Sequence, residues 1–170
     1  MQPERLPHTV NPAKLAQRRI VMGGDIPLSD LERLCEQLLG SEGVVELQLS
    51  FGSDDQGFTT ITGSASTKVS LTCQRCMDKM MFDLSTDISL ALVVDDDAVN
   101  ELPDRYEPIL VEKAGFMPLK SLVEDDLILA LPIVAYHDSD CGFVDEDATQ
   151  EEEAEVSKPN PFSVLEVLKH

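Results

Sequence analysis

Four residues of this chain carry side chains that could together bind a metal ion: Cys73, Cys76, His137 and Cys141. The cysteines of the first pair are spaced Cys-x-x-Cys, and the second pair is spaced His-x-x-x-Cys. Three thiolates and one imidazole make an acceptable tetrahedral zinc set. The sequence therefore offers a structural zinc site as one interpretation of these residues.

Two other interpretations of the Cys-x-x-Cys pair stay open. The pair could be two reduced thiols without a metal, or a redox pair. A thioredoxin-like redox motif lies between a strand and a helix, whereas a strand is expected after Cys76. All four residues fall in predicted turns, which favours a site over core packing, but the second pair lacks the tighter Cys-x-x-Cys spacing. Cys35 lies in an apolar helical stripe and is predicted to be a small core residue.

The elements that position Cys73 and Cys76 are two long segments of alternating apolar and polar residues. Such alternation predicts strands with one buried face. The parity of the apolar positions changes across residues 73–79, so the chain reverses there, and a β-hairpin with both cysteines on its turn is predicted. The buried residues are expected to be Ile61, Ala65, Val69, Leu71 and Cys73, then Phe82, Leu84, Ile88, Leu90, Leu92 and Val94.

The other elements are predicted from caps, periodicity and turn residues. Asn11 and Pro12 begin a short helix, and Ser29 with Glu32 forms a capping box for a helix over 29–39. Residues 22–27 are predicted to form a loop, 44–51 and 106–111 strands, 52–57 a turn and 119–131 a helix. The fold class is therefore α+β: one domain, residues 1–143, with a curved, barrel-like antiparallel β-meander flanked by two or three helices.

The end of the chain differs in composition from this domain. Residues 144–158 are predicted to be a disordered acidic linker, because residues 145–157 are strongly acidic and lack both aromatic residues and periodicity. Residues 159–170 are predicted to form a short amphipathic helix that carries Phe162, Leu165 and Leu168. Its apolar stripe either docks back on the domain or captures a partner in a groove.

The net charge of −19 bears on the class of partner. Residues 95–157 carry 19 acids against Arg105, Lys113 and Lys120. Because nucleic-acid binding is driven by neutralising phosphates, any direct RNA contact would have to be local. A basic protein partner fits this charge better, although acids on a surface can also serve solubility alone.

Two local groups of cations are candidate partner-binding residues. Lys14, Arg18 and Arg19 lie on the first helix, where they either contact an anionic partner or form a solvated face. Arg75 lies on the Cys-x-x-Cys turn, with Lys68 and Lys79 close by on the flanking strands. These three cations support an alternative in which the hairpin turn binds RNA directly.

Several classes of function are not expected. No apolar run reaches the roughly 20 residues that a membrane span needs, and the N-terminus lacks the apolar region of a secretory signal. Four unevenly spaced cysteines indicate reduced thiols in the cytoplasm rather than a secreted disulfide framework. Asp95, Asp96 and Asp97 are interpreted as a solvated loop. No catalytic triad, Gly-rich phosphate loop or HExxH motif is present, so neither an enzyme nor a small-molecule substrate is predicted.

Several segments, taken in this order, resemble the YceD family, the large ribosomal RNA subunit accumulation proteins of bacteria. They are LPHTVNPAKLAQRR, LTCQRCMDKM, DRYEPILV, LVEDDLILALPIV with HDSDC, and KPNPFSVLEVLK. The resemblance spans nearly the whole chain. In some relatives the region after the long helix looks like a cysteine-rich metal knuckle, whereas here that region keeps only His137 and Cys141.

The resemblance implies a role in ribosome biogenesis, in the synthesis, processing or accumulation of 23S ribosomal RNA. It brings no catalytic residues, so we expect a non-enzymatic factor. Its partner is expected to be ribosomal RNA or a basic ribosomal protein of the large subunit. The alternative remains a direct RNA-binding protein that uses the Cys-x-x-Cys turn.

Overall fold

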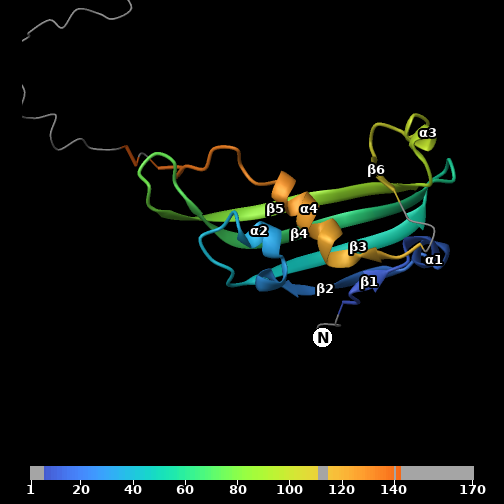
Figure 1. Cartoon of the computed structure of the whole chain (residues 1–170), viewed down its shortest axis with the longest axis horizontal. Helices are drawn as coiled ribbons and strands as arrows, with labels where there is room; N and C mark the ends of the chain where they lie inside the picture. Colours follow the sequence, from blue (N-terminus) through green and yellow to red (C-terminus); the bar gives the residue numbers. More distant parts are fainter. Residues whose placement is uncertain (1–5, 111–114, 140, 143–170) are drawn as a thin grey trace, which may run out of the picture.

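The computed structural model describes residues 6–110, 115–139 and 141–142 (Figure 1). A five-stranded sheet in the order β2-β3-β4-β5-β6 forms the main layer, and β1 pairs with β7 in a small second sheet. The strands are β1 (Thr9–Val10), β2 (Val21–Pro27), β3 (Val44–Ser53), β4 (Thr59–Thr72), β5 (Lys79–Val93), β6 (Glu107–Leu110) and β7 (Met117–Pro118). The helices are α1 (Pro12–Gln17), the 3-10 turn η1 (Leu28–Asp30), α2 (Glu32–Cys35), α3 (Asp96–Val99) and α4 (Leu119–Leu129).

The predicted α+β class and the long hairpin are confirmed. β4 and β5 pair antiparallel from Thr60↔Ala91 to Thr72↔Lys79, so the Cys-x-x-Cys turn lies at the hairpin tip. The prediction of a barrel-like, wholly antiparallel meander is wrong. β6 adds to β5 in parallel, and β2 and β6 are the two outer strands of the sheet. A barrel needs its outer strands to pair with each other, and these two strands do not.

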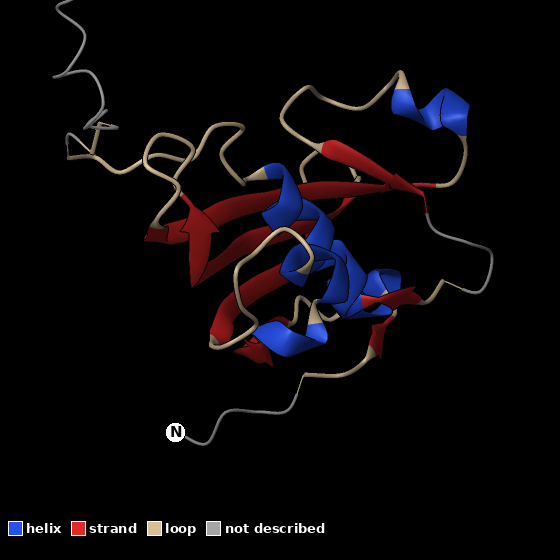
Figure 2. Cartoon of the chain, turned by 60° about the vertical axis from the view of Figure 1, so that its left-hand side comes forward, coloured by secondary structure: helices blue, strands red, loops and turns tan. Residues whose placement is uncertain are grey.

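One face of the sheet is buried under the helices. Figures 1 and 2 show α4 lying across this face, with α2 beside it. The odd-numbered apolar residues of β4 and the even-numbered ones of β5 face this core, as predicted, but Val94 is 84% exposed. At the end of β5, Ala91 and Val93 are buried instead. β5 ends at Val93, so Val94 lies just beyond the strand.

Residues 22–27, predicted to be a loop, form most of strand β2. All seven residues of β2 pair with β3, from Val21↔Ser50 to Pro27↔Val44. The two glycines and the proline suggested a turn, but pairing with a neighbouring strand outweighs such weak local preferences. The predicted strand over 44–51 is confirmed and extends to Ser53.

The helix predicted over 29–39 is much shorter in the structure. Leu31, not Ser29, is the residue that precedes α2, and no side chain caps the helix. The backbone of Leu31 is not helical (φ −104°, ψ 77°), which separates η1 from α2. Leu28, Leu31 and Leu34 are all fully buried, so packing of these three leucines takes precedence over a continuous helix.

The other helix predictions agree more closely with the structure. The Asn11 side chain accepts a hydrogen bond from the Lys14 backbone N–H (3.0 Å), which caps α1 as predicted. α4 begins at Leu119, as predicted, but it ends at Leu129, two residues before the predicted end at Leu131. β6 covers Glu107–Leu110 of the strand predicted over 106–111, and residue 111 lies outside the described part. Residues 95–97 are not only a loop, because α3 begins at Asp96 and Asp95 accepts a hydrogen bond from the Ala98 N–H.

The predicted linker at 144–158 and the predicted helix at 159–170 lie outside the described residues. Within the described residues, none of the helices combines the length and the apolar character that crossing a membrane requires.

Candidate metal centre

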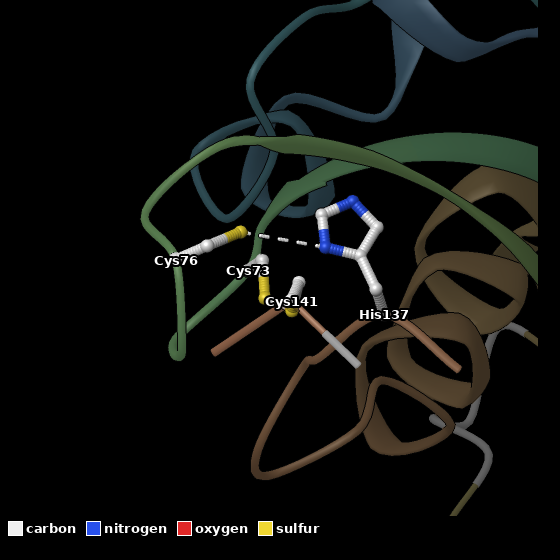
Figure 3. Close-up of side chains that lie close together, drawn as sticks. All are labelled: Cys73, Cys76, His137 and Cys141. Carbon is white, nitrogen blue, oxygen red and sulfur yellow. Dashed lines mark hydrogen bonds between the residues drawn. The ribbon is translucent and has the colours of Figure 1, made fainter. Parts of the chain in front are cut away.

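Two segments that lie far apart in the sequence meet at the hairpin tip. Cys73 and Cys76 lie on the turn between β4 and β5, and His137 and Cys141 lie on the segment that follows α4 (Figure 3). One ligand atom from each of the four residues lies within 4.8 Å of all the others. The structure therefore brings together the four residues that the sequence singled out.

Two of the distances between these atoms match those of a tetrahedral zinc site. Sulfur and nitrogen ligands lie about 2.3 Å and about 2.0–2.1 Å from zinc. Tetrahedral angles then place two sulfurs about 3.8 Å apart and a sulfur and a nitrogen about 3.6 Å apart. The Sγ atoms of Cys73 and Cys141 are 3.6 Å apart, and Cys76 Sγ lies 3.5 Å from His137 Nδ1. The donor set and these two distances therefore fit zinc.

The turn that carries the two cysteines is tightly hydrogen-bonded. The Cys73 N–H donates to the carbonyl of Asp78 (2.8 Å), and the Met77 N–H donates to the carbonyl of Cys73 (2.9 Å). The Arg75 N–H points at Cys73 Sγ (3.5 Å). Met77 has φ +64°, a conformation that costs energy for a residue other than glycine. The turn thus holds a strained residue directly after Cys76, and the sulfurs of Cys73 and Cys76 lie within 4.8 Å of each other.

The segment after α4 is held to this turn by contacts that do not involve the four ligands. The Gln74 N–H donates to the carbonyl of Ala135 (2.8 Å). The Arg75 guanidinium lies over the Tyr136 ring, 5.3 Å from its centroid. Both contacts place His137 opposite Cys76, so the protein itself preorganises much of the site.

The electrostatics of the cluster favour one thiolate in particular. Burial of the Cys73 thiol opposes its ionisation, but hydrogen-bond donors outweigh burial and lower its pKa to about 5. For Cys76, the Asp78 backbone N–H favours the thiolate, yet burial and the nearby sulfurs of Cys73 and Cys141 outweigh it and raise the pKa. Crowded sulfurs resist full ionisation unless a cation lies between them, and zinc is such a cation.

The exposure of the thiols bears on the type of chemistry that they can perform. The four cysteines of the chain are free thiols. Cys73, the most acidic, is 0% exposed, so it cannot reach a substrate as a nucleophile would have to. Cys35 lies apart from the cluster, half-buried, and its thiol donates to the Leu28 carbonyl (3.1 Å). Burial raises the pKa of Cys35, which agrees with the predicted packing role.

The predicted partner-binding cations lie at separate places. Lys14, Arg18 and Arg19 lie on or just after α1, which packs against β3 and β4, away from the hairpin tip (Figure 1). The Lys14 ammonium lies 6.0 Å from the Phe116 ring centroid. Near the tip, Lys68 pairs with Asp83 (3.1 Å). The other predicted partner-binding residues, Phe162, Leu165 and Leu168, lie outside the described part of the chain.

Sequence reasoning missed a polar contact between α2 and α4. Glu124, an acid of α4, is only 7% exposed. Its carboxylate accepts the Leu34 backbone N–H (3.1 Å) and the Arg33 guanidinium (2.9 Å). The signal available in the sequence was the position of Glu124 directly after Val123, within the apolar stripe of the helix.

A second acid of α4, Asp126, is predicted to make stability depend on pH. Burial, followed by the charges of Glu107 and Asp125, raises its pKa from 3.8 to about 6. The folded chain then binds more protons than the unfolded chain between those values, so stability should fall as the pH rises from about 4 to about 6. Above that range, Asp126→Asn should stabilise the fold by about 1 kcal/mol, after allowance for solvent screening.

Urea denaturation over pH 4–8 measures this effect of Asp126. Asp104→Asn is the matched control, because Asp104 lines the same surface hollow but is exposed. A pH profile that is the same in the Asp126→Asn variant and the unaltered chain would contradict the assignment.

Comparison with known proteins shows similarity to one protein family. The family model described as "Large ribosomal RNA subunit accumulation protein YceD" matches residues 61–169. The Haemophilus influenzae protein of that name is 38% identical over 176 residues, which cover 99% of each chain. No solved structure matches the chain significantly.

Proposed function

Because the chain belongs to the YceD family, we propose that it is a non-enzymatic factor in ribosome biogenesis. It supports the accumulation of large-subunit ribosomal RNA by binding a basic protein of that subunit. Family membership is the observation that supports a role in ribosome biogenesis, since the family name ties its members to large-subunit ribosomal RNA. The basic partner is inferred from the charge of the chain.

The negative charges on the outer face of the sheet favour the binding of a cationic partner. Asp25 and Glu46 are both exposed and lie directly opposite each other on β2 and β3. Like charges at paired positions of neighbouring strands destabilise a sheet. Lysine or arginine side chains of a partner would relieve this repulsion, and the net charge of −19 would speed the encounter with such a partner.

Within this proposal, Cys73, Cys76, His137 and Cys141 bind one structural zinc ion. The fit of the interatomic distances to tetrahedral geometry supports zinc, and the complete burial of Cys73 argues against a catalytic thiol. The ion would clamp the hairpin tip to the segment after α4. Two cysteine ligands come from the hairpin turn, and a histidine and a cysteine come from the segment after α4. Each segment therefore needs the other to complete the site.

Depletion of the protein, followed by gradient analysis of ribosomal subunits, tests the role in the cell. We expect a deficit of large-subunit ribosomal RNA that the unaltered chain restores. A chain with Asp25→Lys and Glu46→Lys should restore it poorly, whereas Asp104→Lys with Glu101→Lys changes the charge equally at other exposed positions and should restore it fully. Normal large-subunit levels after depletion would refute the proposed role.

Binding assays on the purified chain separate the two kinds of partner. We expect the chain to retain basic large-subunit proteins and to show no affinity for bare ribosomal RNA. Binding to bare RNA that falls steeply with added salt would instead favour direct RNA recognition.

A further inference from the structure

An apolar groove lies beside the metal centre. Three segments line it: residues 36–39 after α2, residues 71–77 of the hairpin tip, and residues 128–135 at the end of α4. Its volume is about 750 Å³, and three of its apolar side chains are largely exposed: Leu39 (54%), Met77 (70%) and Ile133 (96%). A cluster of exposed apolar side chains around a hollow is typical of a binding surface.

The described chain ends next to this groove. Gln74 and Ala135 both line the groove and are hydrogen-bonded to each other. Cys141, the second-last described residue, has its sulfur 3.6 Å from that of Cys73 on the same turn. The described chain therefore ends at Gly142, near the groove, and residues 143–170 follow in the sequence.

The last twelve residues have the composition that the groove requires. Phe162, Leu165 and Leu168 recur every third residue, after an acidic stretch with no such pattern. A hollow of this size can take two or three large side chains. Lys158 and Lys169 flank these apolar residues, and Glu36 lies on the wall of the groove, so the charges are complementary as well.

We propose that this groove is the binding site of the chain's own C-terminal segment, residues 159–170. The sixteen intervening residues, 143–158, can span about 55 Å when extended and about 20 Å on average when flexible. Such a tether gives an effective concentration in the millimolar range. An intrinsic dissociation constant of about 0.1 mM would then keep the groove about 90% filled. The inference uses neither the zinc ion nor a ribosomal partner, so it stands independently of the proposed function.

Hydrogen exchange tests the inference by comparing two full-length chains. One is the unaltered chain, and the other is a tail variant that carries Phe162→Ser, Leu165→Ser and Leu168→Ser. Backbone amides of residues 36–39, 71–77 and 128–135 should exchange at least fivefold faster in this variant than in the unaltered chain. Leu39→Glu, in the groove wall, should have the same effect. Val94→Glu is the matched control, because Val94 is equally apolar, is 84% exposed and does not line the groove.

A labelled peptide of residues 158–170 provides the second measurement. It should bind the tail variant at least tenfold more tightly than the unaltered chain, whose groove is already filled.

Equal exchange in the unaltered chain and the tail variant would overturn the inference. Protection that appears only at concentrations where sedimentation shows a dimer would assign the groove to a second copy, and protection only after a cell extract is added would assign it to a partner. Metal analysis of the same samples shows separately whether the zinc proposal holds.

Discussion

Replacing Cys141 by serine is expected to lower the zinc content of the purified chain from about one ion per chain to nearly none. The loss follows because the variant keeps only three of the four ligands, and a serine hydroxyl does not ionise at neutral pH to replace a thiolate. Bound metal stabilises the folded state by about 4 kcal/mol when free zinc exceeds the dissociation constant a thousandfold. The variant should therefore also lose the rise in melting temperature that zinc gives the unaltered chain.

Elemental analysis after purification with reductant measures the zinc content, and a thermal scan with and without zinc measures the stabilisation. Substitution with cobalt adds a spectroscopic test, because thiolate-to-cobalt charge transfer should weaken when one of three thiolates is removed. Cys35→Ser is the matched control: it also removes a thiol, but one outside the cluster that donates to the Leu28 carbonyl. A zinc ratio near zero in the unaltered chain would refute the metal site, as would equal zinc in the Cys141→Ser variant.

The hairpin and its cysteines could be predicted because their signals are local. Alternation along β4 and β5 reports which face of each strand is buried, whatever packs on it. The grouping of His137 and Cys141 with Cys73 and Cys76 came from chemistry, since three thiols and one imidazole make an acceptable zinc set, although reduced thiols and a redox pair stayed open. Nothing in the pattern revealed the Gln74–Ala135 hydrogen bond that aligns the two segments, because a backbone contact leaves no trace in residue type.

The parts of the fold that the sequence did not predict depend on distant partners. β2 is a strand because β3 lies beside it, not because of its own residues. The break at Leu31 is set by the core beneath it, and the open sheet is set by the parallel addition of β6. In each case a tertiary contact outweighs a local preference of a few tenths of a kcal/mol per residue.

Glu124 is the clearest such case, and Glu124→Ala is expected to destabilise the fold by about 3 kcal/mol. The buried backbone N–H of Leu34 would lose its acceptor, and the Arg33 guanidinium would lose its less exposed partner. Glu124→Gln keeps an oxygen for the Leu34 N–H but removes the charge, so it should cost less than Glu124→Ala. Chemical denaturation of each variant measures these costs.

Asp125 supplies the comparison that separates burial from charge. It makes an equally short contact with Arg33 (2.7 Å), but its side chain is 59% exposed. An exposed ion pair contributes about 0–1 kcal/mol, so Asp125→Ala should change stability little. If both alanine variants lose the same stability, the contact acts through surface charge alone. If Glu124→Ala loses far more, the buried carboxylate is what fixes α2 against α4, and with it the two helical segments that wall the apolar groove.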